Sequence, residues 1–234
     1  MVFLGLRPDP REIGRQLAGQ IPQPEGATGP ARSLLAIFQQ PAAAVALLAM
    51  VLGQMVMVLV MVITSLHMSD HHHMLGDISI VISAHTFGMY AFSIVSGQLA
   101  DRWGRGPVII AGSSALILAC LAATISPDVV PLGVALFLLG LGWNFCYVGG
   151  SPLLADQLTP VERARTQGFN DLLVGTASAA GSLSSGLIFA TLGYAVMACI
   201  SAAVALLPLA GTTLWSLRRA KAASVITDLT GNAD

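Results

Sequence analysis

The sequence predicts an all-α membrane protein with six transmembrane helices, from its composition and from the length of its apolar stretches. Of the 234 residues, 55% are hydrophobic and only 10% are charged, and the mean hydropathy is +0.76. A soluble domain of this size needs far more charge to cover its surface. Six apolar stretches, each of roughly 20 residues or more, can cross a ~30 Å hydrocarbon core as helices. These stretches are residues 43–66, 78–100, 107–126, 131–153, 170–191 and 194–216.

The chain before the first apolar stretch has a different composition. Proline, glycine, glutamine and arginine dominate residues 7–42, which end in a short apolar group, Leu34, Leu35, Ile37 and Phe38. We therefore expect residues 1–42 to form a cytoplasmic arm with an amphipathic lead-in. Residues 43–217 form the predicted transmembrane domain, and residues 218–234 form a cytoplasmic tail.

The positive charges indicate the orientation of the spans. All 11 lysines and arginines precede the first span or follow the second, fourth and sixth spans, and the alternate connections around 67–77, 127–130 and 192–193 contain none. Positive charge is retained on the cytoplasmic side during insertion. We therefore expect a multi-pass protein of the cell membrane with both termini in the cytoplasm. The charged residues are Arg7, Arg11, Arg15, Arg32, Arg102, Arg105, Arg163, Arg165, Arg218, Arg219 and Lys221.

Composition and motifs argue against several function classes. A net charge of −1 disfavours a nucleic-acid partner. The chain has no G-x-x-x-x-G-K-[ST] motif to hold ATP phosphates, and no H-E-x-x-H or C-x-x-C spacing. We expect no cofactor.

A ten-residue motif between the second and third spans points to a family. Residues 97–106 read G-Q-L-A-D-R-W-G-R-G. This resembles the cytoplasmic signature of the major facilitator superfamily (MFS), G-x-L-a-D-r-x-G-r-[KR]. Gly106 stands where that family often has a second basic residue. The matching positions are Gly97, Leu99, Asp101, Arg102, Gly104 and Arg105.

Two further segments resemble the same family. Residues 159–168 are similar to the loop two helices after the signature, and residues 6–10 are similar to the segment that follows the sixth helix. The resemblance implies that the six spans correspond to helices seven to twelve, the C-terminal half of a twelve-helix transporter with a three-plus-three inverted repeat. A half-transporter and a truncated product of a longer ancestor both remain open.

The resemblance also favours a role for the signature as a cytoplasmic latch. Gly97 and Gly104 can let two helix ends approach closely, and Asp101 can accept hydrogen bonds from the start of the fifth span. Arg102 and Arg105 can then pair with Asp171, Glu162 or Asp156, in a cluster that forms and breaks during alternating access. The alternative is a set of solvated loop charges. The predicted latch comprises Gly97, Asp101, Arg102, Gly104, Arg105, Glu162, Arg163 and Asp171.

Polar residues within the spans are candidates for a solute or proton site. His85 is the only ionisable residue deep within a span, and such residues are costly unless they have a function or a partner. Gln54, Trp143, Asn144 and Tyr147 lie near the middle of the first and fourth spans. By the family resemblance, these two helices line a central cavity. Hydrogen bonding between helices explains all five residues equally well.

Two other patterns have simpler explanations. Ser178, Ser182, Gly186 and Ala190 form a stripe of small residues along the fifth span, which predicts close helix packing and, by the resemblance, contact with the other half. The run His67, His71, His72 and His73 supplies ligands that copper, zinc or nickel accept. A polar loop without special chemistry is the preferred reading of that run, and no metal is expected.

These observations predict that the chain carries a small solute across the lipid bilayer as a secondary-transporter half, paired with a second six-helix half or with itself. The alternatives are a non-transporting remnant or partner subunit and, less favoured, an intramembrane enzyme. The sequence does not identify the solute, because this architecture handles many substrate classes.

Overall fold

The structure, a computed structural model, describes residues 31–231, and helices account for all of the regular secondary structure within this range. The predicted all-α membrane fold is confirmed. The helices are α2 (Leu34–Phe38), α3 (Pro41–Asp70), α4 (Leu75–Tyr90), α5 (Ser93–Trp103), α6 (Arg105–Ala122), α7 (Val129–Ala155) and α8 (Pro160–Gly231).

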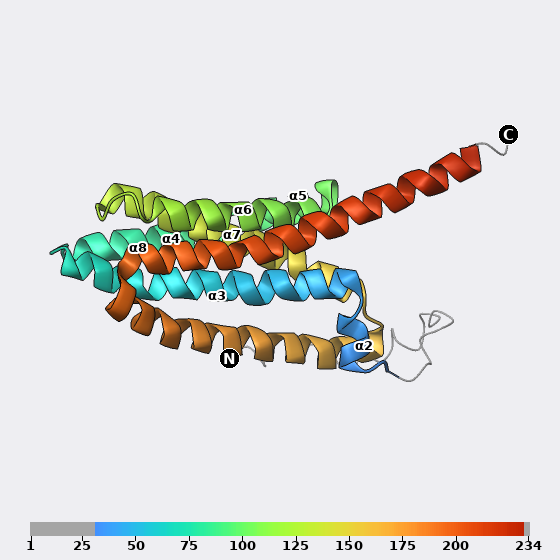
Figure 1. Cartoon of the computed structure of the whole chain (residues 1–234), viewed down its shortest axis with the longest axis horizontal. Helices are drawn as coiled ribbons and strands as arrows, with labels where there is room; N and C mark the ends of the chain where they lie inside the picture. The colour runs from blue at the N-terminus through green and yellow to red at the C-terminus, as the bar shows by residue number, and fades with distance from the viewer. Residues whose placement is uncertain (1–30, 232–234) are drawn as a thin grey trace, which may run out of the picture.

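The last helix contains two spans rather than one. Within α8, Gly193 has φ 80° and ψ 173°, a backbone conformation that is essentially restricted to glycine. The chain reverses direction there (Figure 1). Five described helices are long and apolar enough to cross a membrane when α4 and α5 count as one helix, Leu75–Trp103, and α8 also counts once. Division at Gly193, within the short predicted connection, gives the six predicted spans.

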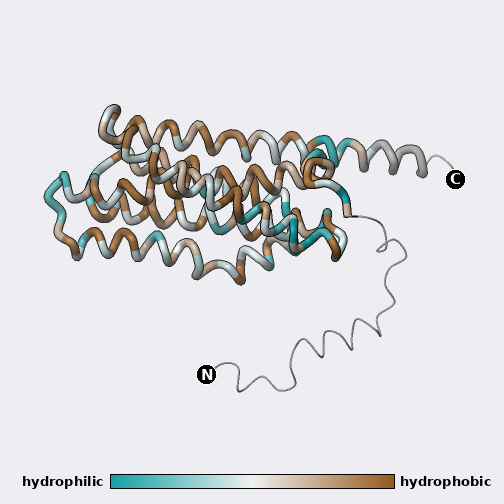
Figure 2. Tube along the Cα trace, turned by 90° about the horizontal axis from the view of Figure 1, so that it is seen from below, coloured by the Kyte–Doolittle hydropathy of each residue, from teal (hydrophilic) through white to brown (hydrophobic). Residues whose placement is uncertain are grey.

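The spans form a bundle whose connections alternate between its two ends (Figure 1). The α5–α6 turn and the α7–α8 connection lie at the same end as α2, and the α3–α4 loop and the kink within α8 lie at the other (Figure 1). Hydrophobic residues predominate along the middle of the bundle, and hydrophilic residues gather at its ends (Figure 2). This distribution fits a helical bundle that spans a bilayer.

Helix α7 is the central element of the bundle, because it packs against α3, α4 and α6. Glycines make this close packing possible. A Cβ atom on Gly142 would lie 2.8 Å from the Leu116 amide nitrogen and 2.9 Å from the Gly112 carbonyl oxygen of α6. A Cβ atom on Gly140 would collide with the His85 carbonyl oxygen of α4. The closest helix contacts therefore involve α7, whereas the sequence drew attention to the small residues of the fifth span.

The second span is interrupted, although the sequence predicted a continuous helix over 78–100. It consists of α4 and α5, with Ala91 and Phe92 between them. Asn144 of α7 stabilises this break, because its Nδ2 donates to the Met89 carbonyl oxygen (2.7 Å) and to Ser93 Oγ (3.0 Å). A break at membrane depth requires such partners for the freed polar groups.

The ends of the transmembrane domain remain predictions. The arm segment that resembles the family, residues 6–10, lies outside the described residues, as does all of 1–30. The lead-in contains α2, whose N-cap Ser33 Oγ accepts a hydrogen bond from the Ala36 amide (3.2 Å). Helix α8 continues past the predicted boundary at 217 and extends beyond the bundle (Figure 1).

Candidate functional site

Three of the predicted mid-span residues form a polar and aromatic cluster between α3 and α7. Trp143 Nε1 donates to Gln54 Oε1 (2.7 Å), and Gln54 Nε2 donates to Ser178 Oγ of α8 (3.2 Å). The Trp143 ring stacks on Tyr147 at a centroid distance of 5.3 Å, and Tyr90 of α4 meets Trp143 edge-on at 6.3 Å. Gln54, Trp143 and Tyr147 are half-buried and Tyr90 is exposed. We call these four residues the aromatic site.

The other two mid-span candidates lie in the interior, away from this cluster. Asn144 is 2% exposed and joins the two parts of the second span, with Ser96 Oγ donating to its Oδ1 (2.7 Å). His85 is 1% exposed, and its Nδ1 lies 3.0 Å from the Leu136 carbonyl oxygen. Its Nε2 is buried without a partner among the described residues. For Asn144 the geometry favours the helix-joining alternative over solute contact.

The signature turn makes fewer contacts than the latch prediction requires. Arg105 Nη1 donates to Asp101 Oδ1 (3.1 Å), and Arg105 Nε donates to Asp156 Oδ2 (3.4 Å). We call these three residues the signature cluster. Among the described residues, no hydrogen bond joins Asp101 to the start of the fifth span, and its ion-pair partner is Arg105. Within the described residues, Arg102, Arg163 and Asp171 are exposed and form no ion pair.

The two signature glycines differ from the expectation that both permit close helix approach. Gly104 has φ 91° and ψ 162° in the turn that joins α5 to α6, so its role is conformational. A Cβ atom on Gly97 would have no described neighbour within 4 Å. The close approach is at Gly106 instead, where a Cβ atom would lie 2.7 Å from Ser216 Oγ of α8.

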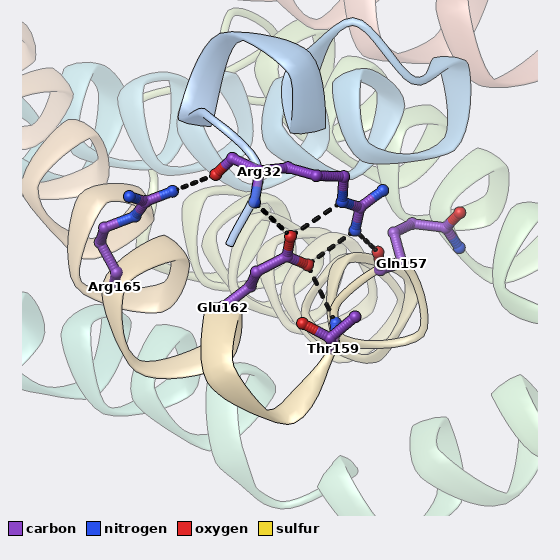
Figure 3. Close-up of polar contacts among 5 residues, drawn as sticks. All are labelled: Arg32, Gln157, Thr159, Glu162 and Arg165. Atoms are coloured by element: carbon purple, nitrogen blue, oxygen red, sulfur yellow. Dashed lines mark hydrogen bonds and ion pairs between the residues drawn. The ribbon is translucent and has the colours of Figure 1, made fainter. Parts of the chain in front are cut away.

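Glu162 pairs with Arg32, not with Arg102 or Arg105 as the latch prediction proposed. Glu162 Oε1 accepts from the Arg32 amide (2.9 Å) and Nε (2.8 Å), and Oε2 accepts from Arg32 Nη2 (2.7 Å). Arg32 Nη2 also donates to the Gln157 carbonyl oxygen (2.7 Å), and Arg165 donates to the Arg32 carbonyl oxygen (Figure 3). We call the five residues labelled in Figure 3 the Glu162 cluster: Arg32, Gln157, Thr159, Glu162 and Arg165.

Local sequence explains why Glu162 lies there. Thr159 precedes α8, Pro160 is its first residue, and Glu162 Oε2 accepts from the Thr159 amide (3.0 Å). This is the reciprocal arm of a capping box, T-x-x-E with proline at the first helical position. The Arg32 guanidinium beside Glu162 holds the pKa of that carboxyl well below its usual range. The capping-box spacing could have located Glu162, but no local pattern pointed to Arg32.

The small-residue stripe and the histidine run are at the surface or close to it. Ser182, Gly186 and Ala190 are exposed, while their neighbours Ala177, Gly181 and Ser185 form the buried side of α8. His67 stacks on Tyr194 at 4.1 Å, and the ring centroids of His67 and His71 are 4.4 Å apart. His72 is exposed, and His73 Nδ1 lies 3.9 Å from Asp77 Oδ2. Within residues 31–231, no group of three or more histidine, cysteine or acidic side chains is arranged to hold a metal.

A bundle of apolar helices with charged turns at one end and a polar, aromatic site at mid-span defines a multi-pass membrane protein. Residues 33–230 match the Major Facilitator Superfamily. The chain belongs to this family, as the signature indicated.

Individual relatives agree with this assignment. An uncharacterized MFS-type transporter of Bacillus subtilis, YdeG, is 37% identical over 94% of this chain and 51% of its own length. A second from the same organism, YddS, is 39% identical over 73% of this chain and 39% of its own length. The riboflavin transporter RfnT of Brucella anthropi is 29% identical over 70% of this chain and 41% of its own length.

These relatives are named as transporters rather than enzymes, which supports the prediction that the chain is not an enzyme. The chain spans about half the length of the curated relatives it matches.

Proposed function

We propose that this chain forms one six-helix half of a secondary transporter, which moves a small solute across the cell membrane by alternating access. The observation that carries the proposal is the aromatic site. An amide and an indole at mid-span are costly in lipid unless they have partners, and here they are half-buried beside exposed Tyr90. Such a site suits a solute that enters a water-filled pathway.

The composition of the aromatic site favours a solute with a planar ring. Tyr90, Trp143 and Tyr147 offer ring faces and edges, and Gln54 offers an amide that can donate and accept. Charged side chains are absent from this set of four residues. Riboflavin, the solute named for the Brucella relative, is therefore the first probe that we would use.

The proposed partner is a second six-helix half or a second copy of this chain. The aromatic site, which is built on α3 and α7, also contacts α8 through Ser178 and includes Tyr90 of α4, and both α4 and α8 have exposed apolar side chains. Ile80 of α4 is 61% exposed and Leu183 of α8 is 80% exposed. A Cβ atom on Gly186 would meet no atom of the described residues within 4 Å, so the small-residue stripe has room to pack against another helix.

Uptake by proteoliposomes tests the transport proposal. Chain reconstituted with its partner half, or at a density that permits self-pairing, should accumulate riboflavin or a related planar solute. Trp143→Ala and Gln54→Ala should each reduce uptake by about tenfold, an expected loss of roughly 1.4 kcal/mol of solute interaction. Leu118→Ala, on the exposed side of α6, is the matched control. Unchanged uptake in both site variants would remove the aromatic site from the pathway.

Crosslinking tests the pairing. Cys120, Cys146 and Cys199 would be replaced, and single cysteines would be placed at Ser182, at Gly186 or, as a control, at Leu118. We expect crosslinked species from the first two positions and not from the third. Solute uptake by demonstrably monomeric chain, without crosslinks, would refute the pairing. Pairing without uptake of any tested solute would favour the partner-subunit alternative.

Reporter fusions test the orientation. The arginine-bearing connections lie at one end of the bundle, which supports a cytoplasmic location for both termini. A C-terminal reporter that is active only outside the cytoplasm should stay inactive, and strong activity would reverse the proposed topology.

A further inference from the structure

A groove at the arginine-bearing end of the bundle is not part of the aromatic site or of the signature cluster, and it shares only Gln157 with the Glu162 cluster. It has a volume of about 680 Å³ and lies between the first turns of α3 and the part of α8 after Pro208. Its walls are mostly apolar and include Val45, Gly211 and Leu214. The groove remains open beside α3 because residue 211 has no side chain. Its Cβ position would touch only Leu48 at 3.8 Å.

The mouth of this groove is cationic. Arg218 and Arg219 line it together with Trp215, and the Arg219 guanidinium lies 5.7 Å from the centroid of the Trp215 ring. Acidic residues are absent from the described lining of the groove, and neither arginine forms an ion pair with a side chain that the structure describes. Arg219 and Trp215 also line a second cavity of about 360 Å³, together with Arg105.

We propose that this groove binds one anionic phospholipid, with its phosphate at Arg218 and Arg219 and an acyl chain along Val45, Gly211 and Leu214.

The chemistry of the two parts favours a lipid over a soluble anion. Two unpaired guanidinium groups are suited to a phosphate, which accepts hydrogen bonds from arginine in a bidentate arrangement. The apolar wall would contribute nothing to a free phosphate, but it would bury an acyl chain. Leu214 and Leu217 are 56% and 63% exposed, so the helix surface next to the mouth faces lipid. Tryptophan and arginine at a helix end commonly lie at the level of the lipid headgroups.

Native mass spectrometry of the delipidated full chain tests this site. We would titrate the chain with dioleoyl phosphatidylglycerol and, in parallel, with dioleoyl phosphatidylcholine. We expect one phosphatidylglycerol to bind about tenfold more tightly than phosphatidylcholine, because two arginines near a membrane surface each attract an anionic lipid. Arg218→Gln with Arg219→Gln should abolish the preference. Arg102→Gln with Arg163→Gln removes the same charge from exposed positions outside the groove and should preserve it.

Two further experiments test the acyl-chain wall and the phosphate site separately. Gly211→Leu should weaken binding of both lipids severalfold, because the side chain fills the apolar wall, while both arginines remain. Gly211→Ala, which fits the available space, is its control. Glycerol 3-phosphate at the same concentration should not displace the lipid. The proposal is overturned by displacement with glycerol 3-phosphate, by equal binding of the two lipids, or by an unchanged preference in the double arginine variant.

Discussion

Two ion-pair clusters at the same end of the bundle differ in how much water surrounds them. In the signature cluster, the side chains of Asp101, Asp156 and Arg105 are 75%, 53% and 27% exposed. In the Glu162 cluster, the Glu162 side chain is only 2% exposed, and Arg32 is 36% exposed. The first cluster has two contacts of 3.1 and 3.4 Å, whereas the Glu162 carboxylate accepts four hydrogen bonds of 2.7 to 3.0 Å.

The signature cluster, which the sequence motif pointed to, is therefore the weaker contact, and the Glu162 cluster is the stronger one. Exposed ion pairs contribute ~0–1 kcal/mol, so the signature cluster can break at little cost. A buried carboxylate that loses its partners leaves a costly unsatisfied charge. The Glu162 cluster therefore fixes the segment before α2 to the start of α8, and the signature cluster is the one suited to a latch.

The largest expected effect is a loss of stability in Glu162→Ala. This change removes all four hydrogen bonds and the helix cap at Thr159. We expect the free energy of unfolding to fall by about 2 kcal/mol, less than the ~3–5 kcal/mol for fully buried pairs, because water can reach Arg32. Thermal unfolding in detergent micelles, followed by circular dichroism, measures this loss. Asp156→Ala is the matched control in the exposed cluster, and an equal loss there would erase the distinction.

Changes in the signature cluster should affect transport, although they should affect stability less than the change at Glu162. Asp101→Asn and Arg105→Ala should reduce uptake by a reconstituted complete transporter on the order of fivefold, a typical size for coupling between states. Membrane insertion of both variants should be unchanged, because Asp101 and Arg105 lie at the α5–α6 turn, at the end of the bundle, and not within the apolar core. Uptake equal to the parent protein in both variants would show that the signature cluster is no latch.

A smaller effect is expected from acid. Because the pKa of Glu162 is lowered in the folded chain, its contribution is complete above the unfolded pKa of about 4.3 and declines as pH falls below it. The difference in unfolding temperature between the parent chain and Glu162→Gln should therefore shrink as the pH falls from about 5 to 3. The rest of the difference should be lost only at still lower pH, as the pH falls through the lowered folded-state pKa of Glu162. A constant difference across this range would mean that the carboxylate is not stabilised by its partners.

The smallest effect is the response to salt. Exposed charges are screened beyond ~10 Å at 0.1 M ionic strength, and buried pairs are screened much less. A double-mutant cycle on Arg105 and Asp156 should give a coupling of roughly 0.5 kcal/mol that disappears at high salt. The same cycle on Arg32 and Glu162 should give a larger coupling that persists. Equal salt dependence of the two couplings would contradict the difference in exposure.

Sequence patterns predicted the spans and the family, because length and hydropathy suffice for a helix in lipid. Gly193 lies inside the predicted connection, and the signature turn joins α5 to α6 where the motif placed it. The partners of individual polar residues were not predictable in the same way. Arg32 and Glu162 are separated by 130 positions, and neither belongs to a pattern that includes the other.

In the candidate site, too, the sequence indicated which residues need a partner but not which partner each one has. Gln54 and Trp143 stood out because polar groups at mid-span need partners, and they proved to be partners of each other. Asn144 satisfied the same criterion but serves a helix break that hydropathy does not reveal, since residues 78–100 are apolar on both sides of it. Periodicity identifies which residues need a partner, and only the packing shows which partner they have.

The break between α4 and α5 divides the second span into two helical segments that can change their relative angle. Helix α4 packs against α7 so closely that Gly88 and Gly140 cannot be replaced by larger residues without a collision. Helix α5, which carries the first residues of the signature, packs less extensively. At the break, the side-chain amide of Asn144 donates hydrogen bonds to Met89 at the end of α4 and to Ser93 at the start of α5. Tilting α5 would therefore exchange the hydrogen bonds of Asn144 and the contacts of α5 with α6 and α7, while the close contacts of Gly88 and Gly140 between α4 and α7 would stay in place.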